Sequence, residues 1–111
     1  MNKKATEKLH KRIEKIKKQL SELGEMRPGS LSTQYNVCGN PNCRCKRPEN
    51  PVKHGPYYQI SYTRKGKSKT EFVKAGDVKM VRQQLKNYQL FKKLIDDWVE
   101  LSLDIARLQK Q

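Results

Sequence analysis

The chain has 111 residues, of which 34% are hydrophobic and 32% are charged, so we expect one small domain with a modest core. Twenty-five Lys and Arg against eleven Asp and Glu give a formal net charge of +14. No run of 18 apolar residues exists and no apolar segment follows the basic N-terminus, which excludes a membrane span and a secretory signal. Three cysteines suit a disulfide scaffold poorly and indicate a reducing, cytoplasmic compartment.

The first predicted element is a basic helix over residues 1–25. Its apolar residues recur at spacings of three and four, the pattern of a coiled-coil seam, and are Leu9, Ile13, Ile16, Leu20 and Leu23. Gly24 and then Pro28-Gly29 end the pattern. Because the apolar stripe is narrow, this helix needs a long partner.

Residues 29–75 predict a small β module. A short strand is expected over 30–37, and a hairpin over 55–74 around Lys65-Gly66-Lys67. A three-residue loop there would place Tyr58, Ile60, Tyr62, Thr70 and Phe72 on one apolar face. It would place Tyr57, Gln59, Ser61, Thr63, Lys69, Glu71 and Val73 on a polar, basic face.

A long helix is predicted over residues 77–110, with Asp77 as its N-cap. Its apolar residues keep a 3–4 rhythm to the C-terminus and are Val81, Leu85, Tyr88, Phe91, Ile95, Trp98, Leu101, Ile105 and Leu108. The expected fold is α+β, a single domain over 1–111 in which two long helices form an antiparallel coiled-coil-like hairpin around a metal-pinned β-hairpin module. Surplus apolar surface on the long helix predicts self-association or a protein partner.

All three cysteines and one histidine fall in the pattern C-x4-C-x-C-x8-H, formed by Cys38, Cys43, Cys45 and His54. Turn-forming residues between Cys38 and Cys43 let the chain double back, and an extended Cys43–Cys45 segment would point both thiols the same way. Three sulfurs and one nitrogen suit a tetrahedral structural Zn²⁺ with no open position for catalysis.

Other interpretations of these residues stay open. The cysteines can be ordinary buried residues with an exposed His54, iron can replace zinc, and water or a partner's side chain can replace His54 as fourth ligand. Clustering of every cysteine at turn residues favours the metal. His10 is expected to face solvent on the basic helix.

The sequence indicates a protein that is not an enzyme. A Cys–His nucleophile pair can be drawn from Cys43 or Cys45 with His54, but no second histidine, phosphate loop or paired acidic motif completes a site. The acidic residues of the long helix follow Lys92 and Lys93 by about one turn, which is typical of an ion-paired, solvated face.

Basic residues concentrate in two blocks, which predicts a nucleic-acid partner, with DNA favoured over RNA. Residues 1–20 hold eight basic and two acidic side chains, and residues 44–74 hold nine and two. Solubility alone or an acidic protein partner would also account for the charge. The candidate contacts are Arg44, Lys46, Arg47, Tyr57, Gln59, Ser61, Thr63, Arg64, Lys65, Lys67 and Lys69, with phosphate contacts from Lys4, Lys8, Lys11, Lys15 and Lys18. Tyr57 can stack on a base, bind a phosphate or pack against the metal loop.

The chain resembles a family of small uncharacterised prokaryotic proteins often encoded near transposases. The resemblance covers roughly residues 29–104, from "GSLSTQYNVCGNPNCRC" through "KHGPYYQISY" to "LIDDWVELS". The shared pattern is C-G-x3-C-x-C followed by H-G-P-Y-Y. The resemblance implies a metal-binding module and a mobile-element context. The residues of this chain that match the family's pattern are Cys38, Cys43, Cys45, His54, Gly55, Pro56 and Tyr57. The hairpin is also similar to β-sheet DNA-binding modules of some integrases, and the basic helix lies outside the resemblance.

The expected function is therefore that of a zinc-stabilised DNA-binding protein, an accessory factor or regulator of a mobile element, associated with the nucleoid. One alternative is an RNA-binding component of a ribonucleoprotein. Another is an interaction adaptor that docks a protein through its helical hairpin.

Overall fold

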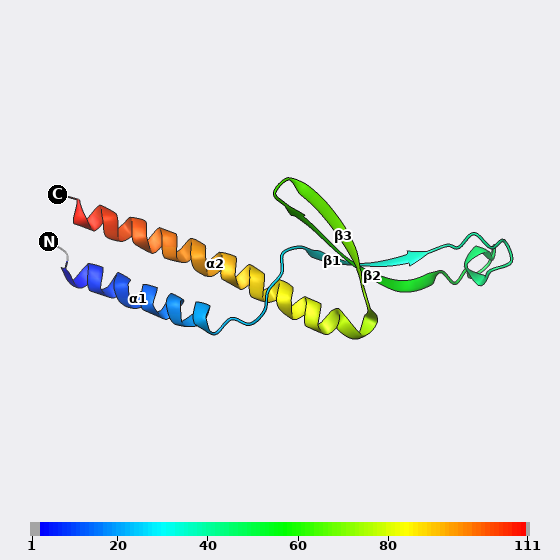
Figure 1. Ribbon diagram of the computed structural model, residues 1–111, viewed down its shortest axis with the longest axis horizontal. Coiled ribbons are helices and arrows are strands. Elements are labelled where there is room, and N and C mark those ends of the chain that lie inside the picture. The colour runs from blue at the N-terminus through cyan, green and yellow to red at the C-terminus, as the bar shows by residue number, and fades with distance from the viewer. Residues whose placement is uncertain (1–2, 111) are drawn as a thin grey trace. The chain divides into compact units, whose positions relative to one another are not determined.

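The computed structural model describes residues 3–110 and contains two helices and a three-stranded antiparallel sheet, which confirms the expected mixed α+β class (Figure 1). The elements in chain order are α1 (Lys3–Ser21), β1 (Ser30–Asn36), the 3-10 turn η1 (Arg44–Lys46), β2 (His54–Arg64), β3 (Lys67–Val73), the 3-10 turn η2 (Ala75–Asp77) and α2 (Val78–Gln109). Positions 1, 2 and 111 of the predicted ranges lie outside the described residues. Asp77, the predicted N-cap, is the last residue of η2, directly before α2.

Contacts divide the chain into two compact units. The helical unit comprises the residues up to Met26 and those from Lys86 onward, and the sheet unit comprises Arg27–Leu85. Within residues 3–110, no helix is apolar enough over a sufficient length to cross a membrane.

The core of the helical unit joins α1 to the C-terminal part of α2. Ile13 and Ile16 of α1 are buried in one cluster with Leu94, Leu101 and Ile105 of α2. Figure 1 shows these helices side by side, with the start of α1 beside the end of α2. The helix ends at Ser21 rather than at residue 25, although Leu23 still packs against the cluster. A coiled-coil geometry for the pair stays a prediction.

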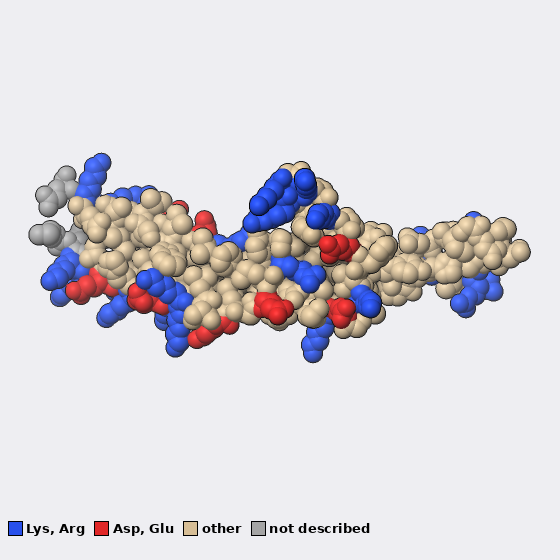
Figure 2. Space-filling view, viewed as in Figure 1, with Lys and Arg blue, Asp and Glu red and all other residues tan. Residues whose placement is uncertain are grey.

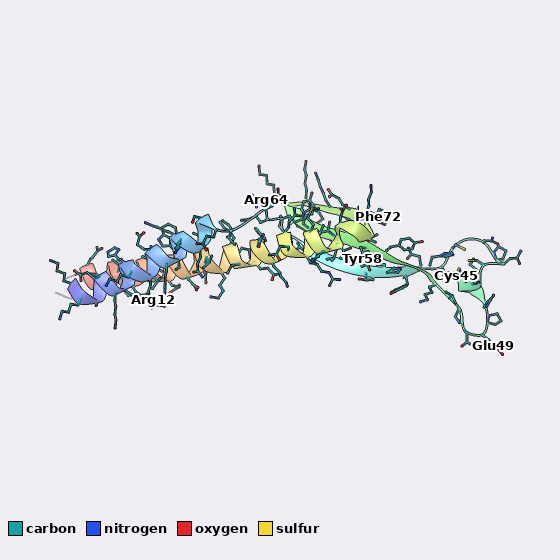
Figure 3. The ribbon with its side chains drawn as sticks, turned by 90° about the horizontal axis from the view of Figure 1, so that it is seen from below. Arg12, Cys45, Glu49, Tyr58, Arg64 and Phe72 are labelled. Carbon is teal, nitrogen blue, oxygen red and sulfur yellow. The ribbon has the colours of Figure 1, made fainter. Side chains whose placement is uncertain are left out.

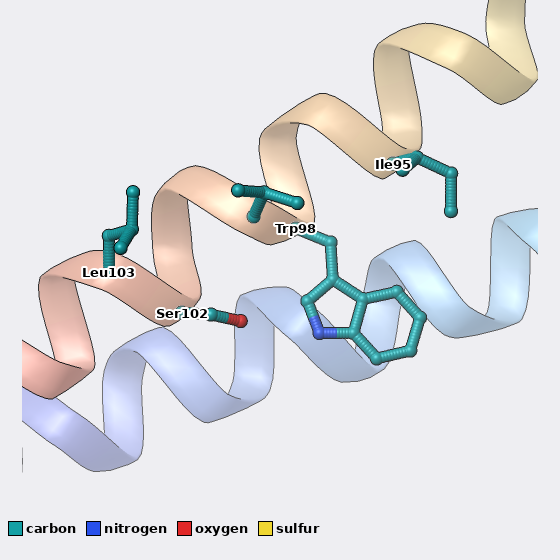
Figure 4. Close-up of a pocket in the computed structure, with 5 residues that line it drawn as sticks. Ile95, Trp98, Ser102 and Leu103 are labelled. Carbon is teal, nitrogen blue, oxygen red and sulfur yellow. The ribbon is translucent and has the colours of Figure 1, made fainter.

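An apolar groove remains on the surface of the helical unit. It has a volume of about 320 Å³ and is lined by Ile95, Trp98, Val99, Ser102 and Leu103 (Figure 4). Val99 is 51% exposed and Leu103 46% exposed, so residues 3–110 leave part of the long helix's apolar surface uncovered. The surplus surface predicted for this helix is therefore present.

Charged side chains on the outside of α2 form exposed ion pairs. Lys93 Nζ lies 3.1 Å from an oxygen of Asp97, and Arg107 lies 2.7 Å from Asp104. Exposed pairs of this kind contribute at most about 1 kcal/mol each. The expected ion-paired, solvated face is present at these positions.

The sheet unit is organised by a small core between one face of the sheet and the start of α2. Strand order is β1-β2-β3, and both pairs are antiparallel. Ile60 of β2 is 1% exposed and packs with Val81 and Leu85 of α2, and Leu31 and Val73 complete the cluster. The start of α2 therefore covers one face of the sheet and leaves the other open.

The turn between β2 and β3 differs from the prediction. Lys65 and Gly66 both have positive φ, 52° and 77°, and Arg64 pairs directly with Lys67. A two-residue loop with positive φ at both positions is the turn that best matches the twist of a hairpin. The predicted three-residue loop is wrong by one residue, and that shift exchanges the two faces of β3.

The uncovered side of the sheet, here called the open face, carries no charged side chain. Its members alternate along the three strands and are Ser30, Ser32, Gln34, Tyr57, Gln59, Ser61, Thr63, Ser68, Thr70 and Phe72. Two pairs of hydroxyls meet across β2 and β3: Ser61 with Thr70 at 3.1 Å, and Thr63 with Ser68 at 2.9 Å. Phe72 and Thr70 thus belong to the open face, whereas Lys69, Glu71 and Val73 belong to the other, the reverse of the prediction.

Replacing Ile60 by Ala should loosen the sheet unit because the substitution removes the centre of its small core. We expect a loss of about 2–5 kcal/mol in the opening free energy of the strands. Amide hydrogen exchange of β1, β2 and β3 measures this quantity.

The matched control is Phe72→Ala, which removes a larger side chain from an exposed position on the same sheet. Its effect should stay within about 0.5 kcal/mol. Equal losses in both variants would show that α2 does not stabilise the sheet through Ile60.

Candidate metal centre

The four predicted ligands lie together at one end of the sheet unit. One ligand atom from each of Cys38, Cys43, Cys45 and His54 lies within 4.8 Å of all the others. Cys38 Sγ and Cys45 Sγ are 3.5 Å apart, and Cys43 Sγ lies 3.1 Å from His54 Nε2. The three cysteines are free thiols. Such a cluster can bind a metal ion.

Short local turns bring the cysteines together. Cys38 follows β1, and the side-chain oxygen of Asn40 accepts a hydrogen bond from the Asn42 amide at 3.0 Å. The Asn40 carbonyl then accepts a hydrogen bond from the Cys43 amide at 3.2 Å, which closes the predicted reversal of the chain. Residues 44–46 form the 3-10 turn η1, so the extended Cys43–Cys45 segment of the prediction is wrong: Cys43 is extended, but Cys45 lies inside a helical turn.

The distances fit a tetrahedral ion. Bonds of about 2.3 Å to sulfur and 2.0–2.1 Å to nitrogen place two sulfurs about 3.8 Å apart, and a sulfur and a nitrogen about 3.6 Å apart. The observed 3.5 Å and 3.1 Å are slightly shorter. The remaining pairs of ligand atoms lie within 4.8 Å, so movements of up to about 1 Å would complete the shell.

The loop that carries the ligands has almost no core of its own. Among residues 37–53, Cys45 alone is buried, at 3% exposed, while Val37 and Val52 are half exposed. Figure 3 shows Cys45 within this loop and Glu49 toward its outer side. Because apolar burial cannot hold the loop, a bound ion would be its main source of order.

The thiols differ in acidity. Hydrogen bonds lower the pKa of Cys43 to about 6, chiefly one with the Cys45 backbone, followed by those with the Cys38 and Cys45 thiols, whereas burial raises the pKa of Cys45. Cys43 is therefore poised as a thiolate at neutral pH. Metal binding has to displace the proton from Cys45, so metal affinity should fall as the pH is lowered.

Gly55 lets β2 begin directly beside β1 at His54, a member of the cluster. Its φ is +140°, and a Cβ added there would lie 2.8 Å from the Gln34 carbonyl oxygen and 2.9 Å from Cδ1 of Tyr35. Only glycine fits both the conformation and the space. The position of His54 therefore depends on Gly55.

The predicted nucleic-acid contacts fall into four groups. Arg44, Lys46 and Arg47 lie in or next to η1, interleaved with the ligands. Figure 2 shows Lys and Arg side chains gathered at the β2–β3 hairpin, where the predicted residues are Arg64, Lys65, Lys67 and Lys69. Tyr57, Gln59, Ser61 and Thr63 belong to the open face, and the exposed lysines Lys4, Lys8, Lys11, Lys15 and Lys18 belong to α1 of the helical unit.

Sequence reasoning missed two features of this surface. Phe72 was placed on the covered face, although it is 77% exposed on the open one. The serines of β1 were not assigned to the polar face, although Ser32 pairs with Gln59 and Ser30 with Ser61. The sequence held no decisive signal for Phe72, because a Lys-Gly pair is not among the pairs that mark a two-residue turn.

Replacing Cys38, Cys45 or His54 singly should weaken metal binding by at least about 10- to 100-fold. Losing a group that only hydrogen-bonds to a ligand already costs that much affinity, and losing a ligand itself should cost more. Competition titration with a chromophoric chelator measures the affinity, and native mass spectrometry the ions per chain. His10→Ala, at an exposed histidine on α1, is the control and should bind like the wild type. Unchanged affinity in His54→Ala would remove His54 from the site.

Gly55→Ala should weaken metal binding and open the β1–β2 ladder beside it, at a cost of about 1–3 kcal/mol for backbone strain. Gly39→Ala is the matched control in the same loop, because nothing lies within 4 Å of its added Cβ and its φ is not positive. The chelator titration compares the two variants. Equal affinities would show that His54 does not depend on the approach of β2 to β1.

Comparison with known proteins gives one family match. The model of a domain of unknown function, DUF6788, matches residues 6–83. The match begins within α1, which the sequence resemblance had left outside, and it ends near the start of α2. No curated protein and no solved structure matches the chain. Since the family model covers more than half of the sequence, including all four residues of the metal cluster, the chain belongs to the DUF6788 family of uncharacterised domains.

Proposed function

We propose that this chain is a non-enzymatic nucleic-acid-binding protein, with DNA as the favoured partner, whose sheet unit is ordered by a structural zinc ion. The observation that carries the proposal is the charge of the sheet unit. Residues 27–85 hold twelve Lys and Arg against three Asp and Glu. Such an excess in so small a unit attracts phosphates and releases their counterions.

The arrangement of those charges supports the same conclusion. Basic residues lie at the hairpin tip and in the metal loop, whereas the open face between them bears only neutral hydrogen-bonding groups and two aromatic rings. In nucleic-acid interfaces, basic groups bind the phosphate backbone of the nucleic acid, and neutral donors and acceptors beside them contact the base edges.

Zinc is proposed as the ion because of the donor set. Three cysteine sulfurs and one imidazole nitrogen are soft and borderline ligands, and four protein donors leave no position for water. The ion would order the loop and hold Arg44, Lys46 and Arg47 in fixed positions beside it. It would take no part in a chemical reaction.

The proposed biological setting is that of an accessory factor or regulator of a mobile element. This setting rests on the sequence resemblance alone. RNA is the alternative partner, since the same charges serve it and exposed aromatic rings stack well on unpaired bases.

Changing Lys65, Lys67 and Lys69 together to Glu should strongly weaken binding to duplex DNA and to RNA, with the residual affinity measurable at low salt. If the three lysines bind phosphates, the slope of log K against log salt should become shallower by about three. Fluorescence anisotropy with labelled oligonucleotides over a salt series measures both quantities.

The control is the triple change of Lys86, Lys92 and Lys110 to Glu in the helical unit, which alters the net charge equally. It should retain most of the affinity. Equal losses in the two triple variants would show that net charge, and not the hairpin, drives binding.

A second candidate function is that of a protein-interaction adaptor, favoured by the apolar groove around Trp98, Val99 and Leu103. In this case a second copy or another protein covers the groove. Light scattering of the wild type and of Leu103→Lys distinguishes self-association from a monomer. A monomeric wild type that binds no nucleic acid at low salt but retains a defined protein would support the adaptor.

A further inference from the structure

Two aromatic side chains lie uncovered on the open face. Phe72 is 77% exposed and Tyr57 is 40% exposed. Phe72 is paired directly with Gln59, and Tyr57 lies two residues before Gln59 on the same strand. The two residues are therefore diagonal neighbours on one face, a spacing of roughly 7–8 Å between residues that long aromatic side chains can span. Aromatic rings left in water on an ordered strand are typical of binding surfaces.

Both rings line one hollow at the end of the hairpin. The hollow has a volume of about 250 Å³, and Pro56 and Val73 supply apolar walls, while Lys74 supplies a single cation at its edge. It therefore suits a flat, apolar group attached to something negatively charged.

The groups beside the hollow narrow the choice of occupant. Gln59 offers both amide donors and an amide acceptor, and the remaining members of the open face toward the hairpin tip are hydroxyls. Lys65 lies in the turn at that tip, whereas Arg64 and Lys67 pair with each other in the register of the covered face. Figure 3 labels Arg64 and Phe72 at opposite ends of the hairpin strands. An aromatic face, neutral edge partners and cations at both ends complement a nucleobase on its phosphate backbone.

We infer that the open face binds unpaired nucleotides of a single strand, with bases stacked on Phe72 and Tyr57. This inference rests on the proposed function and deepens it by naming the ligand. The faces of paired bases are hidden within the stack of a duplex, whereas unpaired bases expose them to aromatic side chains. Gln59 bonds the edge of a stacked base, and Lys74 and the basic tip attract the phosphates.

Full-length protein loaded with zinc is titrated against three labelled probes of equal length: a single-stranded DNA, a single-stranded RNA of the same sequence and the DNA duplex. Phe72→Ala should weaken binding to the single strands by about 5- to 100-fold, the effect of removing one stacked base. Affinity for the duplex should change little. The salt slope should not change, because no charge is lost.

Two further substitutions separate stacking from simple apolar contact. Phe72→Leu keeps an apolar side chain without an aromatic face and should bind weakly, whereas Phe72→Trp should retain single-strand affinity. The fluorescence of the added indole should also be quenched when bases stack on it. This quenching should exceed the change in Trp98 fluorescence that the wild type shows with the same probe.

The outcomes distinguish the two proposals. A wild type that binds none of the three probes at low salt overturns the proposed function and this inference with it. A wild type that binds but prefers the duplex, or a Phe72→Ala variant with undiminished single-strand affinity, overturns the inference alone. A preference between the DNA and RNA single strands identifies the source of the unpaired bases.

Discussion

The turn at Lys65-Gly66 is the constraint on which the sheet unit depends. Placing a lysine in the left-handed region costs about 1–2 kcal/mol, because its Cβ approaches the following carbonyl oxygen. The register that this turn sets places Val73 against the core of Ile60, Val81 and Leu85 and keeps Phe72 out of it. One backbone choice therefore decides which side chains of β3 meet α2 and which meet solvent.

Different interactions hold the centre and the start of β2. Near its centre, β2 is held by apolar contact with α2, as in an ordinary small domain. At its start, His54 and Gly55 depend on close backbone approach and lie beside a cluster of thiols, in a loop whose buried residue, Cys45, belongs to that cluster. A bound ion would make order in this loop depend on metal, whereas order around Ile60 depends on apolar burial.

Much of this arrangement could be predicted from the sequence. The apolar rhythm of the first and last segments predicted both helices, and the clustering of Cys38, Cys43, Cys45 and His54 predicted their meeting in space. The register of the hairpin was missed because β-rich runs around a Lys-Gly-Lys segment fit loops of two or three residues almost equally well, and only the backbone angles of Lys65 decide between them. The pairing of β1 with β2 could not be predicted from the sequence either, because two strands separated by a long loop leave no local signal of their pairing.

The two edges of the sheet are protected very differently. Strand β3 carries Lys67 and Lys69 along its outer edge, and charged edge strands resist pairing with another chain. Strand β1, "SLSTQYN", has no charged residue, and within residues 3–110 no strand pairs with its outer backbone groups. Growth of the sheet by another strand is therefore favoured on one side only, so any strand added by a second molecule would extend the uncharged open face and leave the basic edge free.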